Sequence, residues 1–161
     1  CPLFHLKNHC LSVCCALVYN DPMSKDSTAP LLLTTTGLIN ENKEVLFVKR
    51  ANDPFAGLFS LPGGKVDGHE FLPDSAAREI QEELGVDIAG TLKAAGYKEL
   101  QEPEHAIVFI FTAHVSSGTE FTPKPNEVSE TRWVSKENLN SLGQLPPNHK
   151  LVAEHIFDGA K

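Results

Sequence analysis

The stretch LPGGKVDGHEFLPDSAAREIQEELGV, Leu61 to Val86, joins a glycine-rich turn to a short charged segment. Pro73 and Asp74 mark the start of a helix, with Asp74 as the candidate N-cap. Gly85 marks its end, because glycine readily adopts the left-handed conformation that closes many helices. The stretch therefore predicts a loop followed by a helix.

This helix carries a dense cluster of negative charge. Glu79, Glu82 and Glu83 lie within five positions. Each helical residue turns about 100°, so the three carboxylates share an arc of roughly 100°. Ile80 and Leu84 lie on the next arc, where they can pack against a sheet. One interpretation of the acidic arc is a helix face exposed to solvent.

The other interpretation is an incomplete metal site. The three glutamates occupy the C-terminal half of the helix, where the macrodipole disfavours them, and no lysine follows any of them by four residues. Ligands that are all oxygen suit Mg²⁺ or Mn²⁺. Gly63 and Gly64 permit backbone conformations that are closed to other residues, so a carbonyl there can point at the same ion. The loop and helix together predict a site that unites a metal with a polyphosphate.

The stretch also resembles a known signature, G-x5-E-x7-R-E-U-x-E-E-x-G-U, where U is aliphatic. The pattern is similar to the Nudix box of the Nudix hydrolases, with no departure at any fixed position. The resemblance implies an α+β Nudix fold, a mixed β-sheet sandwiched between helices (αβα). The matching residues are Gly64, Glu70, Arg78, Glu79, Ile80, Glu82, Glu83, Gly85 and Val86.

The resemblance further implies hydrolysis of a nucleoside diphosphate linked to another moiety, by in-line attack of a metal-activated water on phosphorus. It assigns Glu79, Glu82 and Glu83 as ligands of Mg²⁺ or Mn²⁺, together with the carbonyl of Gly63. Gly64, Glu70 and Arg78 are then expected to support the site, with Glu70 and Arg78 as an ion pair that orients the ligands.

The general base varies within this family, so we rank Glu79 first and Glu127 second. Glu127 stands six residues before Trp133 in the segment NEVSETRWVS, which also contains Glu130. It resembles the loop glutamate of mutator-type members. The alternative is that Glu127 is a loop acid exposed to solvent.

Four features bear on the substrate. The segment VKRANDPFAGLFSLPGG, residues 48–64, resembles ADP-ribose pyrophosphatase-like members, so we favour a substrate of the ADP-ribose type. The segment LPPNHKLV resembles the purine-reading segment of mutator-type enzymes that act on 8-oxo-dGTP, which makes Asn148 a candidate base reader or, alternatively, a helix cap. Phe55 and Phe59 are candidates for stacking on a base or for packing the loop, and Arg50 for a phosphate or a surface acid.

The first thirty residues are expected to form an N-terminal appendage to a Nudix domain at 31–161. All four cysteines lie in the first fifteen residues, which favours reduced thiols in a cytoplasmic protein. The alternative is a Zn²⁺ knuckle with His5 or His9. Residues 1–22 resemble the small zinc ribbon that precedes the domain in some ADP-ribose pyrophosphatase-like members, but Phe4 and Ser12 stand where that ribbon has cysteines. We therefore do not expect Zn²⁺ at this cluster.

The remaining pattern alternates between strands and helices, which favours an α+β or layered αβα arrangement. Glycine- and proline-rich loops are expected at 51–64 and 116–130. Strands are expected at 11–19, 31–39, 44–50, 106–115 and 131–135, a weaker strand pair at 86–100, and closing helices at 136–142 and 148–157.

The charge of the whole chain limits its partners. Lysines and arginines number 14 against 21 acids, a net charge of −7, which argues against binding a nucleic acid polymer. No apolar run is long enough to span a membrane. We therefore expect a cytoplasmic enzyme acting on a small nucleotide, with a homodimer as one open alternative. A non-catalytic Nudix-fold ligand sensor is the rival hypothesis, although such modules would be expected to lose box glutamates.

Overall fold

The computed structural model describes residues 29–101 and 104–159. Within this part of the chain the order is seven strands, two α-helices and one 3-10 helix. The elements are β1 (Leu31–Ile39), β2 (Val45–Arg50), β3 (Phe59–Ser60), β4 (Gly63–Lys65), α1 (Leu72–Leu84), β5 (Lys93–Leu100), β6 (Ala106–His114), β7 (Val128–Val134), η1 (Lys136–Leu142) and α2 (His149–Gly159).

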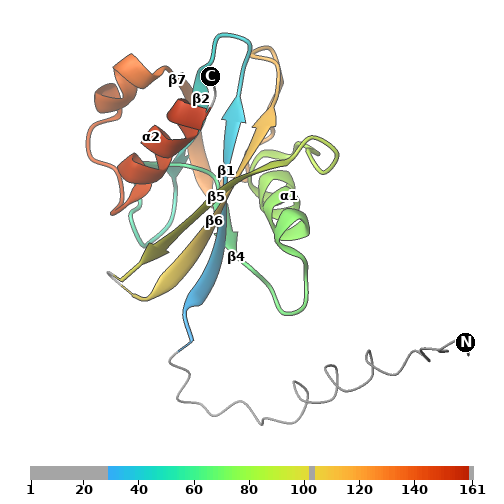
Figure 1. Cartoon of the computed structure of the whole chain (residues 1–161). Coiled ribbons are helices and arrows are strands. Elements are labelled where there is room, and N and C mark those ends of the chain that lie inside the picture. The colour runs from blue at the N-terminus through green and yellow to red at the C-terminus, as the bar shows by residue number, and fades with distance from the viewer. Residues whose placement is uncertain (1–28, 102–103, 160–161) are drawn as a thin grey trace, which may run out of the picture.

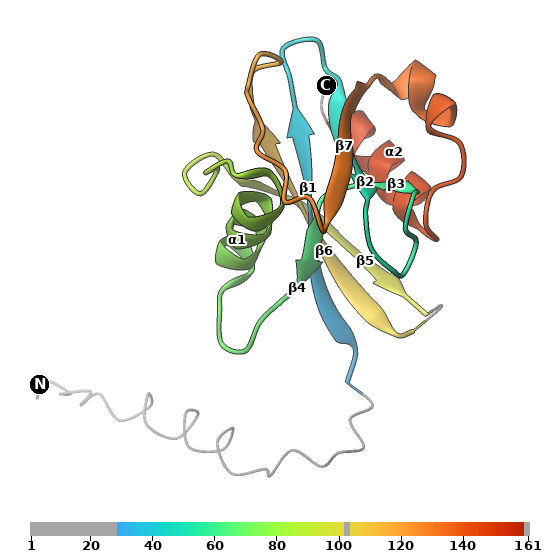
Figure 2. The same ribbon diagram turned by 180° about the vertical axis from the view of Figure 1, so that it is seen from behind.

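The strands form one mixed sheet with helices on both faces. Its main path is β3-β2-β1-β6-β5, and β4 pairs with β1 while β7 pairs with β2. Strands β1 and β6 are parallel along their whole length, and the other pairs are antiparallel. Figures 1 and 2 show α1 on one side of the sheet and α2 on the other. The expected α+β fold with a mixed sheet between helices is confirmed.

Alternating side chains divide the core into two layers, because successive residues of a strand point to opposite faces. Leu38 and Leu46 belong to a buried cluster with Ile80 of α1. Their neighbours Ile39 and Val45 belong to a second cluster, with residues of η1 and α2. This second layer anchors α2, whose first residues lie beside the functional site described below.

The sheet forks along β1. The C-terminal end of β1 pairs with β2 in the register Ile39 to Val45, whereas residues 33–35 of β1 pair with β4. The Pro62 carbonyl accepts hydrogen bonds from the Thr36 N–H at 3.0 Å and from Thr35 Oγ1 at 3.2 Å. Strand β2 meanwhile turns to β3 and β7. The segment between β3 and α1 is therefore fixed to the centre of the sheet.

Several element boundaries differ from expectation. The N-cap of α1 is Phe71, which forms no side-chain cap, and Asp74 lies in the first turn rather than at the cap. Its carboxylate still lies at the positive end of the helix dipole. Gly85 closes the helix as predicted, with φ 73°. The remaining corrections are the short strands β3 and β4 inside the expected loop, a single strand β5 within 86–100, an earlier start of β7, and a 3-10 helix at η1.

The expected appendage at residues 1–30 falls almost entirely outside the described residues, as do the expected strand at 11–19 and the cysteine cluster. The division into appendage and domain therefore stays a prediction. Among residues 29–101 and 104–159, no helix has the length and apolar character needed to cross a membrane.

The packing of α1 leads to a stability prediction. Ile80 is fully buried, so Ile80→Ala should lower the free energy of unfolding by about 2–5 kcal/mol through lost contacts and a cavity. Chemical denaturation measures this change. Leu151→Ala is the control, because Leu151 on α2 is 48% exposed and should cost far less. Equal losses in both variants would show that α1 does not depend on this contact.

Candidate active site

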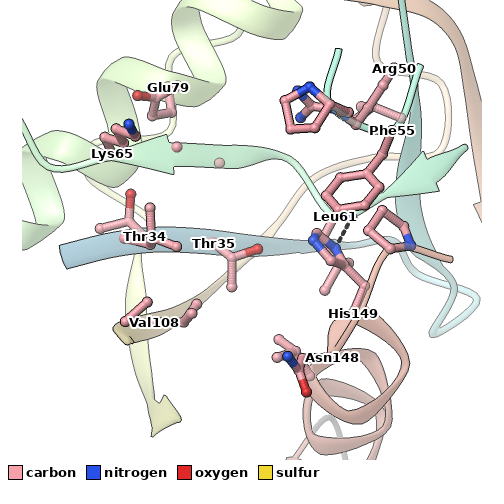
Figure 3. Close-up of a pocket in the computed structure, with 18 of the residues that line it drawn as sticks. Thr34, Thr35, Arg50, Phe55, Leu61, Lys65, Glu79, Val108, Asn148 and His149 are labelled. Carbon is pink, nitrogen blue, oxygen red and sulfur yellow. Dashed lines mark hydrogen bonds between the residues drawn. The ribbon is translucent and has the colours of Figure 1, made fainter. Parts of the chain in front are cut away.

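A cavity of about 510 Å³ lies between β4, α1 and the start of α2. Figure 3 shows Glu79 and Lys65 on one side of it, Phe55, His149 and Asn148 on the other, and Thr34 and Thr35 of β1 between. The structure brings most of the sequence-predicted residues to this cavity. Those that line it are Arg50, Phe55, Gly63, Gly64, Glu79, Glu82, Glu83, Glu127 and Asn148.

Arg78 is the central cation of the acidic helix. Its guanidinium makes a two-point contact with Glu70, from Nε to Oε2 at 3.0 Å and from Nη2 to Oε1 at 2.8 Å. Nη2 also donates to the Lys65 carbonyl, and Nη1 donates to Glu79 Oε1 at 2.9 Å. The bonds from Arg78 hold the pKa of Glu70 down at about 2. The loop before α1 is thereby tied to the helix.

Arg78 also reduces the repulsion within the acidic arc. Its Nη1 lies 3.5 Å from Glu82 Oε1, in an i,i+4 relation. The sequence has no lysine four residues after any of these glutamates, but Arg78 stands four residues before Glu82 and relieves it from that side. Burial nevertheless outweighs Arg78 at Glu79, and the pKa of Glu79 is raised.

Glu83 is an acid whose charged form is destabilised by its surroundings. Its Oε2 accepts a hydrogen bond from the Gly63 N–H at 3.3 Å. Burial, followed by the negative charge of Glu79, raises its pKa from 4.5 to about 8. A carboxylate in such a place is stabilised by a bound cation, because the cation offsets both desolvation and repulsion.

Two glycines allow the loop to approach this close. Gly63 has φ 143°, and a Cβ there would lie 2.2 Å from the Thr34 carbonyl oxygen. A Cβ on Gly64 would lie 2.5 Å from Glu79 Oε1. The backbone of β1 therefore excludes a side chain at Gly63, whereas a side chain at Gly64 would require the Glu79 carboxylate to move.

Glu127 comes to the site from the loop before β7. Its carboxylate contacts Lys124 Nζ at 2.6 Å, and its negative charge contributes to the raised pKa of Glu83. The loop is attached to the end of α1, since the Lys124 N–H donates to the Glu83 carbonyl at 3.1 Å. Glu127 is thus part of the acidic cluster rather than an isolated loop acid.

The donor set fits a hard divalent cation. Glu79, Glu82, Glu83 and Glu127 offer only oxygen, and all line one cavity. In the described residues, no three His, Cys, Asp or Glu side chains already form a cluster that could hold a metal ion. Arg78 and the Gly63 N–H instead hold carboxylate oxygens that a metal would compete for. The role of the Gly63 carbonyl as a ligand stays a prediction.

Arg50 and Phe55, two candidate substrate-binding residues before β3, are linked through one loop. Arg50 donates from Nε to the Pro54 carbonyl at 2.8 Å and from Nη2 to Asn52 Oδ1 at 3.2 Å. These bonds hold the loop that carries Phe55, which has φ 71° and is 39% exposed. Phe55 therefore offers an accessible ring at the cavity.

The expectation that Phe59 stacks on a base is wrong, because this residue lies in the core. Phe59 is 5% exposed, belongs to the core cluster of α2 and does not line the cavity. Its ring lies beneath Arg132, 4.5 Å from the ring centroid. Asn148 does line the cavity, directly before α2, with φ 66°.

His149 is a site residue that the sequence did not reveal. It begins α2 and lines the cavity, and its Nδ1 accepts a hydrogen bond from the Leu61 N–H at 3.3 Å (Figure 3). Burial, and then the positive charge of Arg50, lower its pKa to about 4. A single histidine before an amphipathic helix carries no signal of this contact, which spans 88 residues of sequence.

Comparisons with known proteins agree with this geometry. The profile of a family described as NUDIX domain matches residues 33–156. An ADP-ribose pyrophosphatase of Methanocaldococcus jannaschii is 33% identical over 123 residues, covering 74% of this chain and 70% of that protein. An 8-oxo-dGTP diphosphatase of Haemophilus influenzae is 30% identical over 125 residues, covering 76% and 89%.

Solved structures show the same fold. The NUDIX domain of Shewanella oneidensis NrtR, crystallised with ADP ribose, superposes with a TM-score of 0.75 at 23% identity, covering 94% of this chain and all of that one. At that identity the likeness shows the fold alone.

The raised pKa of Glu83 leads to a prediction for the metal-free protein. The folded carboxyl binds its proton more tightly than the unfolded one, so the free energy of unfolding falls as pH rises from 4.5 toward about 8. Glu83→Gln removes this loss. We expect the Tm of the wild type to fall more than that of the variant between about pH 6 and about pH 8 in EDTA.

Glu130→Gln is the matched control. Glu130 has a lowered pKa, chiefly from its bond with Arg132, and therefore stays ionised over this range. Its variant should follow the wild type, and identical slopes for all three proteins would contradict the account of Glu83.

Proposed function

The chain belongs to the Nudix hydrolase family and is a pyrophosphohydrolase, and on that premise we propose that it cleaves the diphosphate of an ADP-ribose-type substrate with Mg²⁺ or Mn²⁺. Nudix enzymes as a family depend on divalent metals, and a structural neighbour was crystallised with a Mn ion. A cytoplasmic location and a homodimer remain proposals from the sequence.

The charge of the cavity is the observation that carries the substrate proposal. Five glutamates line the cavity against the two cationic side chains Arg50 and Lys65. A diphosphate diester carries fewer negative charges than a nucleoside triphosphate, so it meets less repulsion in such a cavity. The relative named as an ADP-ribose pyrophosphatase supports this direction.

The main alternative is a nucleotide-pool hydrolase of the mutator type that acts on 8-oxo-dGTP or a related triphosphate. Asn148 at the cavity supports it, as does the relative named as an 8-oxo-dGTP diphosphatase. A non-catalytic sensor is disfavoured, because every acid of the box is present and all three helix glutamates line the cavity.

The residues of the chain divide the proposed work. Glu79, Glu82 and Glu83 would hold the cation, which supplies charge stabilisation at phosphorus and an activated water. Glu79 remains the first candidate for general base and Glu127 the second, since burial raises the pKa of Glu79 toward the range a base needs. Phe55 would stack on the nucleobase at the open end of the cavity.

A direct comparison of substrates tests the proposal. With Mg²⁺, we expect kcat/KM for ADP-ribose to exceed that for 8-oxo-dGTP by at least about tenfold, because of the charge difference. Chromatography should identify AMP and ribose 5-phosphate as products. A preference for 8-oxo-dGTP, with release of pyrophosphate, would replace the proposed substrate by the mutator-type alternative.

Removal of single carboxylates tests the metal assignment. Glu82→Gln and Glu83→Gln should each lower kcat by about two orders of magnitude or more while the circular dichroism spectrum stays unchanged. Glu130→Gln is the control, because Glu130 lies outside the cavity lining on β7 and should keep full activity. Near-normal turnover by both helix variants would refute the assignment of these acids as ligands.

A further inference from the structure

His149 is held in one neutral form by its surroundings. The Leu61 N–H donates to Nδ1, so that nitrogen must carry a lone pair and the proton of the neutral ring must lie on Nε2. Burial and the charge of Arg50 on β2 both oppose a second proton. The start of α2 opposes it as well, since the N-terminal end of a helix disfavours a cation.

In the part of the chain that the structure describes, the proton on Nε2 has no acceptor. Within residues 29–101 and 104–159, the bond to Leu61 is the one hydrogen bond that the structure gives to this ring. His149 lines the cavity. A polar N–H in such a wall is costly unless a ligand or water accepts from it.

The position of His149 separates it from the acidic cluster. Figure 3 shows the ring rising from the start of α2 toward Leu61 and Phe55, across the cavity from Glu79. A diphosphate at the glutamates would therefore direct its nucleoside or sugar portion toward this wall. Both portions carry oxygen or nitrogen atoms that accept hydrogen bonds.

We propose that His149 is a specificity-determining residue whose Nε2–H donates a hydrogen bond to an acceptor on the nucleoside or sugar portion of the substrate. Its contact with Leu61 keeps the donor aimed, because the backbone N–H fixes both the ring and its tautomer. The inference rests on the proposed function only in that the substrate is a nucleoside diphosphate derivative or a nucleotide.

Two amide variants separate the two nitrogens of the ring. His149→Asn keeps an acceptor near the Nδ1 position but has no donor at Nε2. His149→Gln places an amide N–H near Nε2 but loses the acceptor for Leu61. We therefore expect His149→Asn to keep the wild-type Tm and to raise KM about five- to twentyfold with kcat nearly unchanged.

His149→Gln should lower the Tm, because it loses the acceptor for the Leu61 N–H. Its KM should lie between those of the wild type and His149→Asn, because it keeps a donor that Leu61 no longer aims. Each variant is measured with ADP-ribose and with 8-oxo-dGTP. If the wild type turns over only 8-oxo-dGTP, the proposed substrate fails, while His149 is still judged on that turnover. A wild-type KM in His149→Asn on the substrate that the enzyme does use would overturn the inference.

Imidazole ¹H–¹⁵N spectra provide a readout that does not depend on turnover. The wild type is titrated with ADP-ribose and with 8-oxo-dGTP in EDTA. The ring should be the Nε2–H tautomer throughout, and its Nε2–H resonance should shift with at least one of the two ligands. A resonance that neither ligand moves, or an Nδ1–H tautomer, would refute the role of His149.

Discussion

The guanidinium of Arg78 is the interaction on which the geometry of the site depends. It forms hydrogen bonds to the Lys65 carbonyl and to Glu70 on the loop, and to Glu79 on its own helix. The planar fork of an arginine can serve several acceptors at fixed angles, which a lysine cannot. One side chain thus fixes where the loop meets the helix and offsets part of the charge that the helix carries.

Arg78 does not reach every acid of the cluster. Glu83 is half-buried on the side of the helix that faces Gly63. Among the described residues, the N–H of that glycine is the one backbone donor to its side chain. The chain thus places an acid whose ionisation is unfavourable in the wall of the cavity. Active sites commonly concentrate such unfavourable groups, because the ligand supplies the missing stabilisation. The rest of α1 tolerates this, since Ile80 and Leu84 are fully buried against the sheet.

The sequence predicted those parts of the structure that depend on local pattern. The long strands β1 and β6 follow from runs of β-branched and apolar residues, and the end of α1 follows from Gly85. Strands β3 and β4 have two and three residues, so they show no periodicity and exist because β1 and β2 bind them. Phe59 appeared in a loop for the same reason, although pairing with β2 buries it.

The candidate site was predicted as far as its spacing is local. The helix acids and their arginine lie within five residues of one another, so helical geometry brings them together. The bond of Leu61 to His149 joins segments 88 residues apart, and the contacts of Arg50 with Pro54 and Asn52 depend on the conformation of a loop. Nothing in residue type or spacing specifies either contact, so only the folded chain reveals them.

In this fold, the residues that stabilise the sheet along β1 differ from those that contact a ligand. Backbone hydrogen bonds join β1 to β4 and to β6. Most side-chain replacements leave such backbone bonds in place. A ligand in the cavity would contact residues of the loops, such as Phe55 and Asn148. Substitutions in those loops can therefore change which molecule enters with little effect on the stability of the sheet. The substrate specificity of such a protein can therefore change while its sheet and its acidic helix stay the same.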